Sequence, residues 1–374
     1  MWIKRYADAI TVPPWGGAVT SNASAYLLQY TWLARAWRRF KRDLLLLLTG
    51  QLQLAQAKVP QTAKRVLYVY LGTPQLGDSI MDLSSRVLWQ ERGLQVDMFT
   101  HGSIAYFYAQ DPSFNRVITD ARDLDVHYDF LVLQSYGAKC LKFKWRYFFS
   151  KPFMALHGHY YGCEFNRLEF ADGAWRYALG LPSVPSNEVC PPVFNLRLCH
   201  ALRARKKCQI FLAVGGVVAW RTYSHWADVI REASKRIPDI EWVLLGSANG
   251  LEQAASIMHT FAGSQSVINY VDAMPLEGVF ELLQTAGLLV AADGGLLHVG
   301  RAAQAPVLGL FAGAIHPRMR FGRAEAAHVI HTASAVEQIA PEVIASAIQA
   351  HFQHAMAALT FEYLDDEPSH DDYL

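Results

Sequence analysis

Val290-Ala-Ala-Asp-Gly-Gly-Leu-Leu-His298 is the stretch of sequence that decides the fold. It continues the apolar run 288–291, which predicts a buried strand, and it leads into residues with the composition of a helix. Asp293 ends the strand. The N–H groups of a first helical turn bind phosphate well, and glycines let a ligand approach closely. The sequence therefore predicts an anion site at Gly294 and Gly295, next to an aspartate suited to sugar hydroxyls.

The same stretch excludes two common nucleotide-binding motifs. It lacks the Gly-Lys-Ser/Thr ending of a P-loop and the G-x-G-x-x-G spacing of a dinucleotide site. His298 lies in the first turn of the predicted helix, with Leu296 beside it. A histidine there either lines the site or is packed inside the protein, and the sequence leaves both interpretations open.

Strands and helices alternate along most of the chain. Such alternation predicts parallel sheets with helical crossovers, which bind ligands at the carboxyl ends of their strands. A proline cluster from Pro182 to Pro192 predicts a linker between two α/β domains. We expect strands at 66–71, 96–99, 130–134, 209–214, 242–245, 288–291 and 307–310, and helices at 78–91, 141–149, 165–179, 223–236, 251–261, 276–284, 296–304 and 342–359.

Length and composition exclude several classes of protein. The 374 residues suggest two domains, and a hydrophobic content of 52% with 18% charged residues excludes overall disorder. A net charge of +1 excludes a globally basic nucleic-acid binder. The five cysteines are odd in number and lack C-x-x-C spacing, which favours a reducing compartment over a disulfide framework or a zinc ribbon. With neither a signal peptide nor an apolar run of membrane-spanning length, the chain is predicted to be cytoplasmic.

The two ends of the chain differ in charge. Residues 1–64 carry nine Lys/Arg against two acids, and residues 361–374 carry six acids and no Lys/Arg. Residues 25–57 lack proline and predict one long or two shorter helices. Between Trp32 and Arg42 they mix aromatic and basic side chains, which is typical of a helix at an anionic membrane surface. A helix packed on the main body is the alternative.

Two further groups of residues follow predicted strands. In the loop Gly72–Ser79, Gly77 allows a close approach, and Asp78 is either a helix N-cap or, in a cleft, a general base. After strand 209–214, Arg221 is either a diphosphate clamp or an ordinary loop arginine. Gly215 and Thr222 lie near Arg221, and Gly246, Ser247 and Glu252 lie beyond the next strand, where they could line a nucleotide pocket. Glu252 is also typical of an acidic residue in the first turn of a helix.

Taken together, these loops resemble glycosyltransferase family 9, the ADP-heptose:lipopolysaccharide heptosyltransferases, over residues 66–330. The resemblance rests on Leu76-Gly-Asp78, on Trp220-Arg-Thr-Tyr-Ser-His-Trp226, on Met274-Pro-Leu-Glu-Gly278, and on Asp293 to His298 followed by Pro306 and Phe311. It implies the α/β GT-B fold, in which two Rossmann-like doubly wound domains face a cleft. The expected divisions are a helical extension at 1–64, an acceptor domain at 65–195, a nucleotide-sugar domain at 205–340, and a helix with an acidic tail at 341–374.

The resemblance also implies an activity and the residues that carry it. The expected enzyme is a metal-independent, inverting glycosyltransferase that moves a heptose from ADP-heptose to a glycan such as bacterial lipopolysaccharide core. Asp78 matches the family's proposed catalytic base. The donor-binding residues are expected to be Gly77, Gly215, Arg221, Thr222, Gly246, Ser247, Glu252, Met274, Asp293, Gly294, Gly295, Leu296 and His298.

Alternatives to this activity stay open at this point. They are a protein heptosyltransferase of the autotransporter type, a GT-B sugar-nucleotide epimerase, and a non-catalytic nucleotide-sugar-binding module. No cofactor or metal is expected beyond the nucleotide-diphosphate sugar as co-substrate. The expected partners are that sugar nucleotide, a glycan or lipid-linked acceptor, and an anionic inner-membrane surface through residues 25–57, with no nucleic acid.

Three departures from the family pattern affect these expectations. Gly294 stands where the family usually has a threonine, which removes a hydroxyl that would meet phosphate. Arg221 stands where a lysine is common, which keeps the charge and changes the donor geometry. The basic N-terminal 64 residues are foreign to the compact members of the family.

Overall fold

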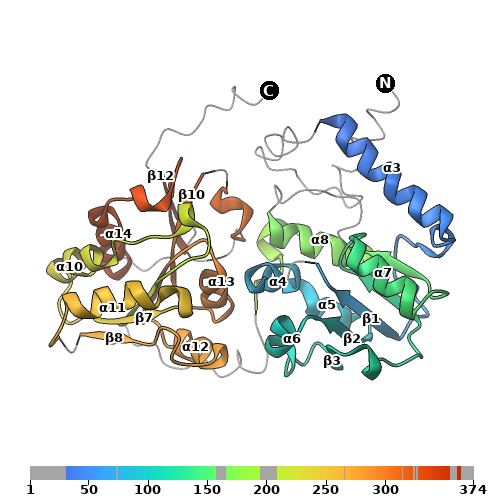
Figure 1. Cartoon of the computed structure of the whole chain (residues 1–374), viewed down its shortest axis with the longest axis horizontal. Helices are drawn as coiled ribbons and strands as arrows, with labels where there is room; N and C mark the ends of the chain where they lie inside the picture. Colours follow the sequence, from blue (N-terminus) through green and yellow to red (C-terminus); the bar gives the residue numbers. More distant parts are fainter. Residues whose placement is uncertain are drawn as a thin grey trace. The chain divides into compact units, whose positions relative to one another are not determined.

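The computed structural model describes residues 31–72, 75–156, 166–193, 209–264, 266–313, 315–322, 325, 327–353 and 360–363. These residues divide into two compact units (Figure 1). Unit 1 contains the described residues up to Cys190, and unit 2 contains those from Pro191 onward. Each unit has its own parallel sheet flanked by helices, which confirms the predicted α/β fold.

The sheet of unit 1 has five parallel strands in the order β3-β2-β1-β4-β5. The chain moves outward from β1 to β3 and then returns to the other side of β1, so the direction of winding switches between β1 and β4. Doubly wound sheets bind ligands at this switch point. The strands are β1 (Arg65–Tyr70), β2 (Gln95–Thr100), β3 (Arg116–Ile118), β4 (Phe130–Leu133) and β5 (Phe153–Ala155).

The alternating side chains of β1 divide the core of unit 1 between the two faces of the sheet. Tyr68 packs edge-on against Trp175 on one face, and Val69 belongs to the cluster around Phe143 and Phe153 on the other. The helices of this unit are α3 (Trp32–Leu48), α4 (Leu76–Asp82), α5 (Leu88–Glu91), α6 (Gly102–Tyr108), α7 (Ala138–Tyr147) and α8 (Arg167–Leu179).

The single helix expected at 78–91 is wrong. A 3-10 turn at Ser84–Val87 separates α4 from α5, and Ser85 has non-helical backbone angles. The break turns polar side chains inward: Arg86 forms a fully buried ion pair with Asp111, and the Ser85 hydroxyl donates to Asp172. Polar contacts with distant residues thus override the local helical pattern.

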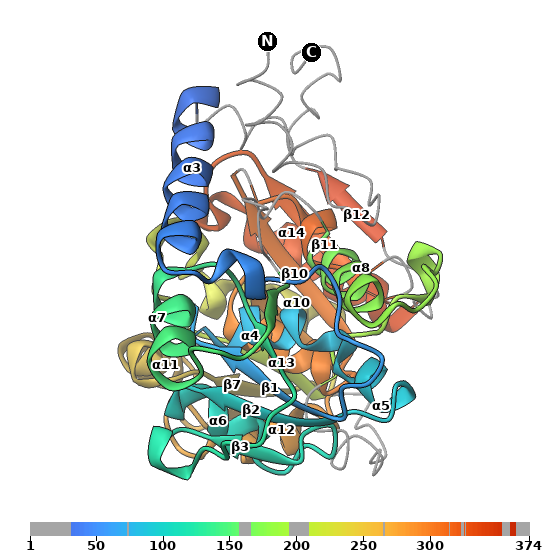
Figure 2. The ribbon, with the colours of Figure 1, turned by 90° about the vertical axis from the view of Figure 1, so that its right-hand side faces the viewer.

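The N-terminal helix is shorter than predicted. Of the expected range 25–57, residues 25–30 lie outside the described residues, and α3 ends at Leu48. Thr49 follows as the C-cap, and Gly50 has the left-handed φ of 68° that commonly ends a helix. Views from two sides show α3 reaching out from unit 1 with its C-terminal end near α7 (Figures 1 and 2). None of the described helices is long and apolar enough to cross a membrane.

The sheet of unit 2 has seven parallel strands in the order β12-β11-β10-β9-β6-β7-β8. Its winding switches between β6 and β9, which are direct neighbours. The strands are β6 (Gln209–Ala213), β7 (Glu241–Leu245), β8 (Val267–Asn269), β9 (Leu288–Ala292), β10 (Val307–Ala312), β11 (Ala327–Thr332) and β12 (Thr360–Tyr363).

Helices cover both faces of this sheet (Figure 1). Ile344 and Ile348 of the last helix are fully buried in the same core cluster as Trp226 and Trp242, so this helix belongs to unit 2. The four-part division of the chain stays a prediction. The helices are α10 (Trp226–Arg236), α11 (Leu251–Thr260), α12 (Leu276–Leu283), α13 (Gly295–Ala302) and α14 (Pro341–Gln353).

Candidate functional site

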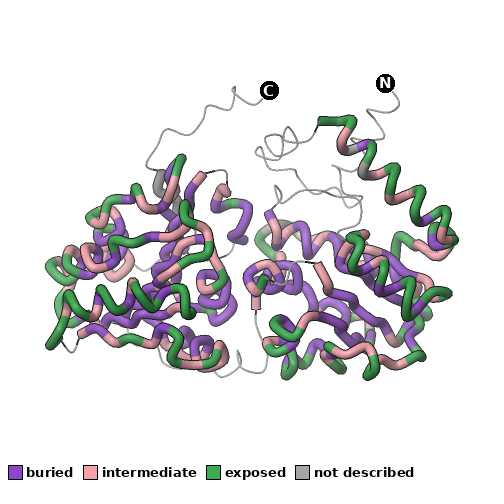
Figure 3. The backbone as a smooth tube through the Cα atoms, in the orientation of Figure 1, coloured by how far each residue is buried: buried purple, intermediate pink, exposed green. Residues whose placement is uncertain are grey.

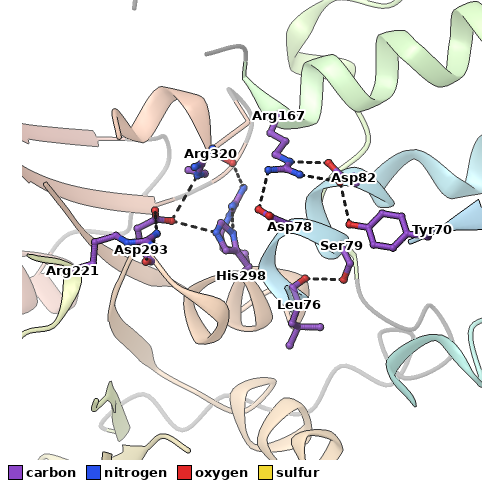
Figure 4. Close-up of polar contacts among 11 residues, drawn as sticks. Tyr70, Leu76, Asp78, Ser79, Asp82, Arg167, Arg221, Asp293, His298 and Arg320 are labelled. Atoms are coloured by element: carbon purple, nitrogen blue, oxygen red, sulfur yellow. Dashed lines mark hydrogen bonds and ion pairs between the residues drawn. The ribbon is translucent and has the colours of Figure 1, made fainter. Parts of the chain in front are cut away.

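Three neighbouring strands of unit 2 each lead into a charged residue of one cluster. Arg221 follows β6, Asp293 follows β9 and Arg320 follows β10. Nη1 of Arg221 donates to Oδ2 of Asp293 at 3.1 Å, and Nε of Arg320 lies 3.8 Å from Oδ1 (Figure 4). The cluster lies at the winding switch of the sheet, where doubly wound folds bind their ligands.

His298 is a buried member of this cluster with a fixed tautomer. Nη1 of Arg301 lies 2.8 Å from Nδ1 of His298, and because arginine only donates, Nδ1 must be the acceptor. The proton is therefore on Nε2, 3.4 Å from Oδ1 of Asp293. Burial lowers the pKa of His298, which favours the neutral ring. With both nitrogens engaged inside the protein, His298 fits the packed interpretation and orients Asp293.

The cluster carries more positive charge than negative. Arg221, Arg301 and Arg320 face two carboxylates, Asp293 and Glu325, and Glu325 accepts from Arg301 at 2.6 and 2.7 Å. Burial alone would raise the pKa of Asp293, but the His298 N–H and the nearby arginines lower it well below its usual range. One positive charge is left over, next to the N-terminus of α13.

The cluster also has unused hydrogen-bond donors. Within the described part of the chain, the buried Nη1 of Arg320 and Nε of Arg221 have no hydrogen-bond partner. Buried donors without partners are costly, and the first-turn N–H groups of α13 add further donors nearby. The cluster can therefore satisfy an anion such as a diphosphate.

The glycines at the start of α13 leave open space. A Cβ built on Gly294 would meet only the Ala292 carbonyl oxygen, at 3.6 Å, and one built on Gly295 would meet nothing within 4 Å. Gly294 is the N-cap and has an extended backbone that any residue adopts. Packing therefore does not account for these two glycines, and the space beside them is open to a ligand.

Two other glycines predicted to bind the donor have a structural reason. Gly215 has a left-handed φ of 82°, and a Cβ there would lie 2.7 Å from Cα of Gly250. A Cβ on Gly246 would lie 2.6 Å from the Val214 carbonyl oxygen. Close contact between the loops after β6 and β7 thus requires glycine at both positions.

Apart from Gly77, which lies in α4 of unit 1, the remaining predicted donor residues follow neighbouring strands of unit 2. The Thr222 hydroxyl donates to the Val218 carbonyl, and that of Ser247 donates to Asn249. Glu252 is exposed in the first turn of α11. Leu296 is half-buried in α13, and Met274 is half-buried next to Gly278 at the start of α12.

Asp78 lies in the first turn of α4, after β1 and thus beside the winding switch of unit 1. The N-cap of α4 is Gln75, so the N-cap interpretation of Asp78 is wrong. Nη1 of Arg167 donates to Oδ1 of Asp78 at 2.8 Å (Figure 4). The other nitrogens of the same guanidinium donate to Asp82 at 2.7 and 2.9 Å.

Asp82 and Asp78 differ in burial and in whether a carboxylate oxygen is available to a substrate. Asp82 is fully buried and also accepts from the Tyr70 hydroxyl at 3.1 Å. The Asp78 side chain is 21% exposed, and its Oδ2 has no partner among the described residues. Although burial opposes it, the carboxylates of Asp82 and Asp78 raise the pKa of Arg167 above its already high value. Asp78 is therefore the carboxylate of this pair that can accept a proton from a substrate, and Gly77 precedes it in the same turn.

Sequence reasoning missed five members of these two clusters. A weak signal existed for Arg320, which lies in the loop after the predicted strand 307–310, and for Arg301, which is three residues from His298 on the same helix. Glu325 and Asp82 had no pattern of their own. Arg167 lies 89 residues from Asp78, so no local pattern relates the two.

Comparison with known proteins relates the chain to one family. Residues 219–343 match the model of glycosyltransferase family 9 (heptosyltransferase), and no curated protein matches the sequence. The solved structure of the glycosyl transferase family 9 protein from Veillonella parvula DSM 2008 is 14% identical, with a TM-score of 0.62 over 80% of this chain and 99% of that one.

Two E. coli enzymes have a similar fold. Heptosyltransferase WaaC with ADP is 18% identical, with a TM-score of 0.56 over 77% of this chain and 98% of that one. ADP-heptose lps heptosyltransferase II is 16% identical, with a TM-score of 0.58 over the same shares. At such identities the likeness establishes the fold, and it confirms the expected GT-B class.

Proposed function

Because residues 219–343 match the glycosyltransferase family 9 (heptosyltransferase) model, we propose that the chain transfers a heptose from ADP-heptose to a glycan acceptor such as lipopolysaccharide core. The observation that supports this most is the Arg221–Asp293 pair at the winding switch of unit 2. The pair lies inside the matched segment, and the cluster around it combines a surplus of positive charge with a carboxylate. A sugar joined to a diphosphate needs both.

We assign the diphosphate to the start of α13. The N–H groups of Gly294 and Gly295 and the guanidinium of Arg221 would hold its oxygens, and the leftover positive charge would stabilise the leaving nucleoside diphosphate. Asp293, oriented by His298, would accept a hydrogen bond from a sugar hydroxyl. Leu296 would pack against the sugar.

The other predicted residues are assigned to the nucleoside half of the donor. Glu252 would accept from ribose hydroxyls, and Ser247 and Met274 would contact the ribose and the base. Gly215, Gly246 and Thr222 would shape the loops beside them. These assignments follow from the positions of the residues after β6, β7 and β8.

In unit 1 we assign the role of general base to Asp78. Gly77, which is expected to bind the donor, would leave room beside Asp78 for the donor sugar to approach. Oδ2 of Asp78 would take the proton of the acceptor hydroxyl as that oxygen forms a bond to the anomeric carbon. The bond from that carbon to the diphosphate oxygen breaks in the same step, and its electrons leave with the nucleoside diphosphate. A single displacement of this kind inverts the anomeric configuration.

The test is to incubate the purified chain with ADP-heptose, with and without heptose-free lipopolysaccharide core, and to follow ADP release and product mass. Transfer predicts a product one heptose heavier and ADP release that depends on the acceptor. Donor isomerisation or hydrolysis without acceptor would favour the epimerase, and binding without turnover on any glycan would favour a binding module. A protein acceptor labelled in a lysate would favour the protein heptosyltransferase.

Attachment to the cytoplasmic face of the inner membrane through residues 25–57 is also part of the proposal. A lipid-linked acceptor is presented at that surface, so attachment would raise its local concentration. The basic and aromatic composition of these residues supports it.

A further inference from the structure

Helix α3 turns its apolar side chains away from unit 1. Six large side chains recur along it with a spacing of one, three or four residues, so they lie on one face. Their exposed fractions range from 37% for Leu44 to 76% for Leu48, and Figure 3 shows exposed segments along the whole length of the helix, between half-buried and buried ones. We call these residues the α3 stripe: Leu33, Trp37, Phe40, Leu44, Leu47 and Leu48.

Three charged side chains on the other side of α3, Arg39, Arg42 and Asp43, are partly buried. Asp43 forms ion pairs with Arg39 at 3.6 Å and Arg42 at 3.4 Å. The guanidinium of Arg42 lies over the ring of Tyr136, and Leu46 is buried in the core cluster of that side of the sheet. The contacts of Arg42 and Leu46 with unit 1 fix the orientation of the helix, and they therefore determine that the α3 stripe is the exposed face.

The apolar surface continues from the end of α3 to the end of α7. The buried side chain of Gln51 donates to the Phe149 carbonyl at 3.2 Å, and Lys144 donates to the same oxygen at 2.7 Å and to Gln51. These bonds hold the end of α3 beside Phe149. The Phe149 ring is 52% exposed and contacts the equally exposed ring of Trp145.

The charges on the exposed sides of both helices are positive. Lys41 lies over the Trp37 ring, and Lys139, Lys142 and Arg146 are exposed on α7. The single acid in the two helices is Asp43, which is paired with Arg39 and Arg42. Apolar and aromatic side chains bordered by lysine and arginine are typical of helices that lie in the plane of an anionic membrane surface.

We propose that the α3 stripe, together with Trp145 and Phe149, is a docking surface for an anionic lipid bilayer. The stripe would enter the headgroup region, and the four basic side chains would contact lipid phosphates. This inference rests on the membrane attachment proposed above and assigns it to particular residues: Arg39 and Arg42 are paired with Asp43, so other basic residues supply the attraction. A second copy is a poorer partner, since a two-fold contact through this surface would bring its own positive charges together.

Flotation of the full chain with phosphatidylcholine vesicles, with and without phosphatidylglycerol, tests the proposal. It needs no donor or acceptor, so its failure would remove the proposed membrane attachment and leave the proposed transfer activity untouched. The wild type is expected to float with the anionic vesicles, and Trp37→Ser/Phe40→Ser to bind them about tenfold more weakly. Lys142→Glu/Arg146→Glu should lose the preference for anionic lipid. Val217→Ser, which changes an exposed side chain of unit 2, is the matched control and should float like the wild type.

Two results would overturn the proposal. One is a wild type that floats with neither vesicle, and the other is a stripe variant that floats as well as the wild type. If the wild type instead sediments as a dimer that Trp37→Ser/Phe40→Ser dissociates, the stripe is an interface between copies. Thermal unfolding of each variant confirms that the fold is retained, which is expected because the substituted side chains are exposed.

Discussion

Arg167 holds Asp78 and Asp82 with one guanidinium, 2.8 Å from the first and 2.7 Å from the second. The two contacts have different consequences. Asp82 is fully buried, and the positive charge of Arg167 offsets part of the free-energy cost of burying its carboxylate. Asp78 is partly exposed and keeps one oxygen free of described partners, so the same arginine orients the carboxylate without occupying it.

Replacing Arg167 should therefore damage stability more than replacing Asp78. Arg167→Met removes the cation that is paired with the buried Asp82 carboxylate, and breaking a buried pair this way costs about 3–5 kcal/mol. Asp78→Asn should change the free energy of unfolding by less than about 1 kcal/mol, because its pair is partly exposed. Urea unfolding measures both. The double variant Arg167→Met/Asp82→Asn is the control, and it should recover part of the loss.

Asp78→Asn should act on turnover instead. If Asp78 takes the acceptor proton, its loss should reduce kcat by about 10²-fold or more, which is the usual scale of general-base catalysis. The affinity for ADP should stay within a factor of about two, because the residues assigned to the ADP part of the donor lie in unit 2. Steady-state rates and calorimetry separate these effects. Near-normal turnover in this variant would remove Asp78 from the mechanism.

Site residues that are adjacent in the sequence could be predicted from it, and site residues that come from different strands could not. Asp293, Gly294 and Gly295 are adjacent and end an apolar run, so the strand–turn–helix unit was predicted correctly. Arg320 joins Asp293 only because β10 lies next to β9. Strand order is a non-local property, and no periodicity reports it.

The differences between the predicted and the observed helices and strands also arise from short elements and from contacts between distant residues. β3, β5 and β8 have three residues each, which is too few for a pattern, and β11 is interrupted by two histidines. The break after α4 follows from the pairing of Arg86 with Asp111, 25 residues away. Likewise, the composition of α3 indicated an amphipathic helix but not which face points outward, which its contacts with Tyr136 and the core decide.

Arg221→Ala should weaken binding of ADP-heptose and of ADP alike. Loss of charge-assisted hydrogen bonds costs about 1.5–3 kcal/mol each, or roughly 10- to 100-fold in affinity. AMP, which lacks the second phosphate, should lose less. Isothermal titration of the three ligands checks this. Unchanged affinity for both diphosphates would make Arg221 a structural partner of Asp293 alone.

The glycines provide the last prediction, because two positions expected to bind the donor have opposite steric surroundings. Gly294→Thr places its side chain in open space on an extended backbone, so the melting temperature should not fall. The added hydroxyl can donate to a phosphate oxygen, and one such bond of about 1 kcal/mol would tighten ADP roughly fivefold. Gly215→Ala is the matched contrast. Its left-handed φ and the 2.7 Å approach to the Gly250 backbone should cost about 2 kcal/mol or more of stability. If Gly294→Thr instead weakened ADP binding while the fold stayed intact, the diphosphate would not lie at the start of α13.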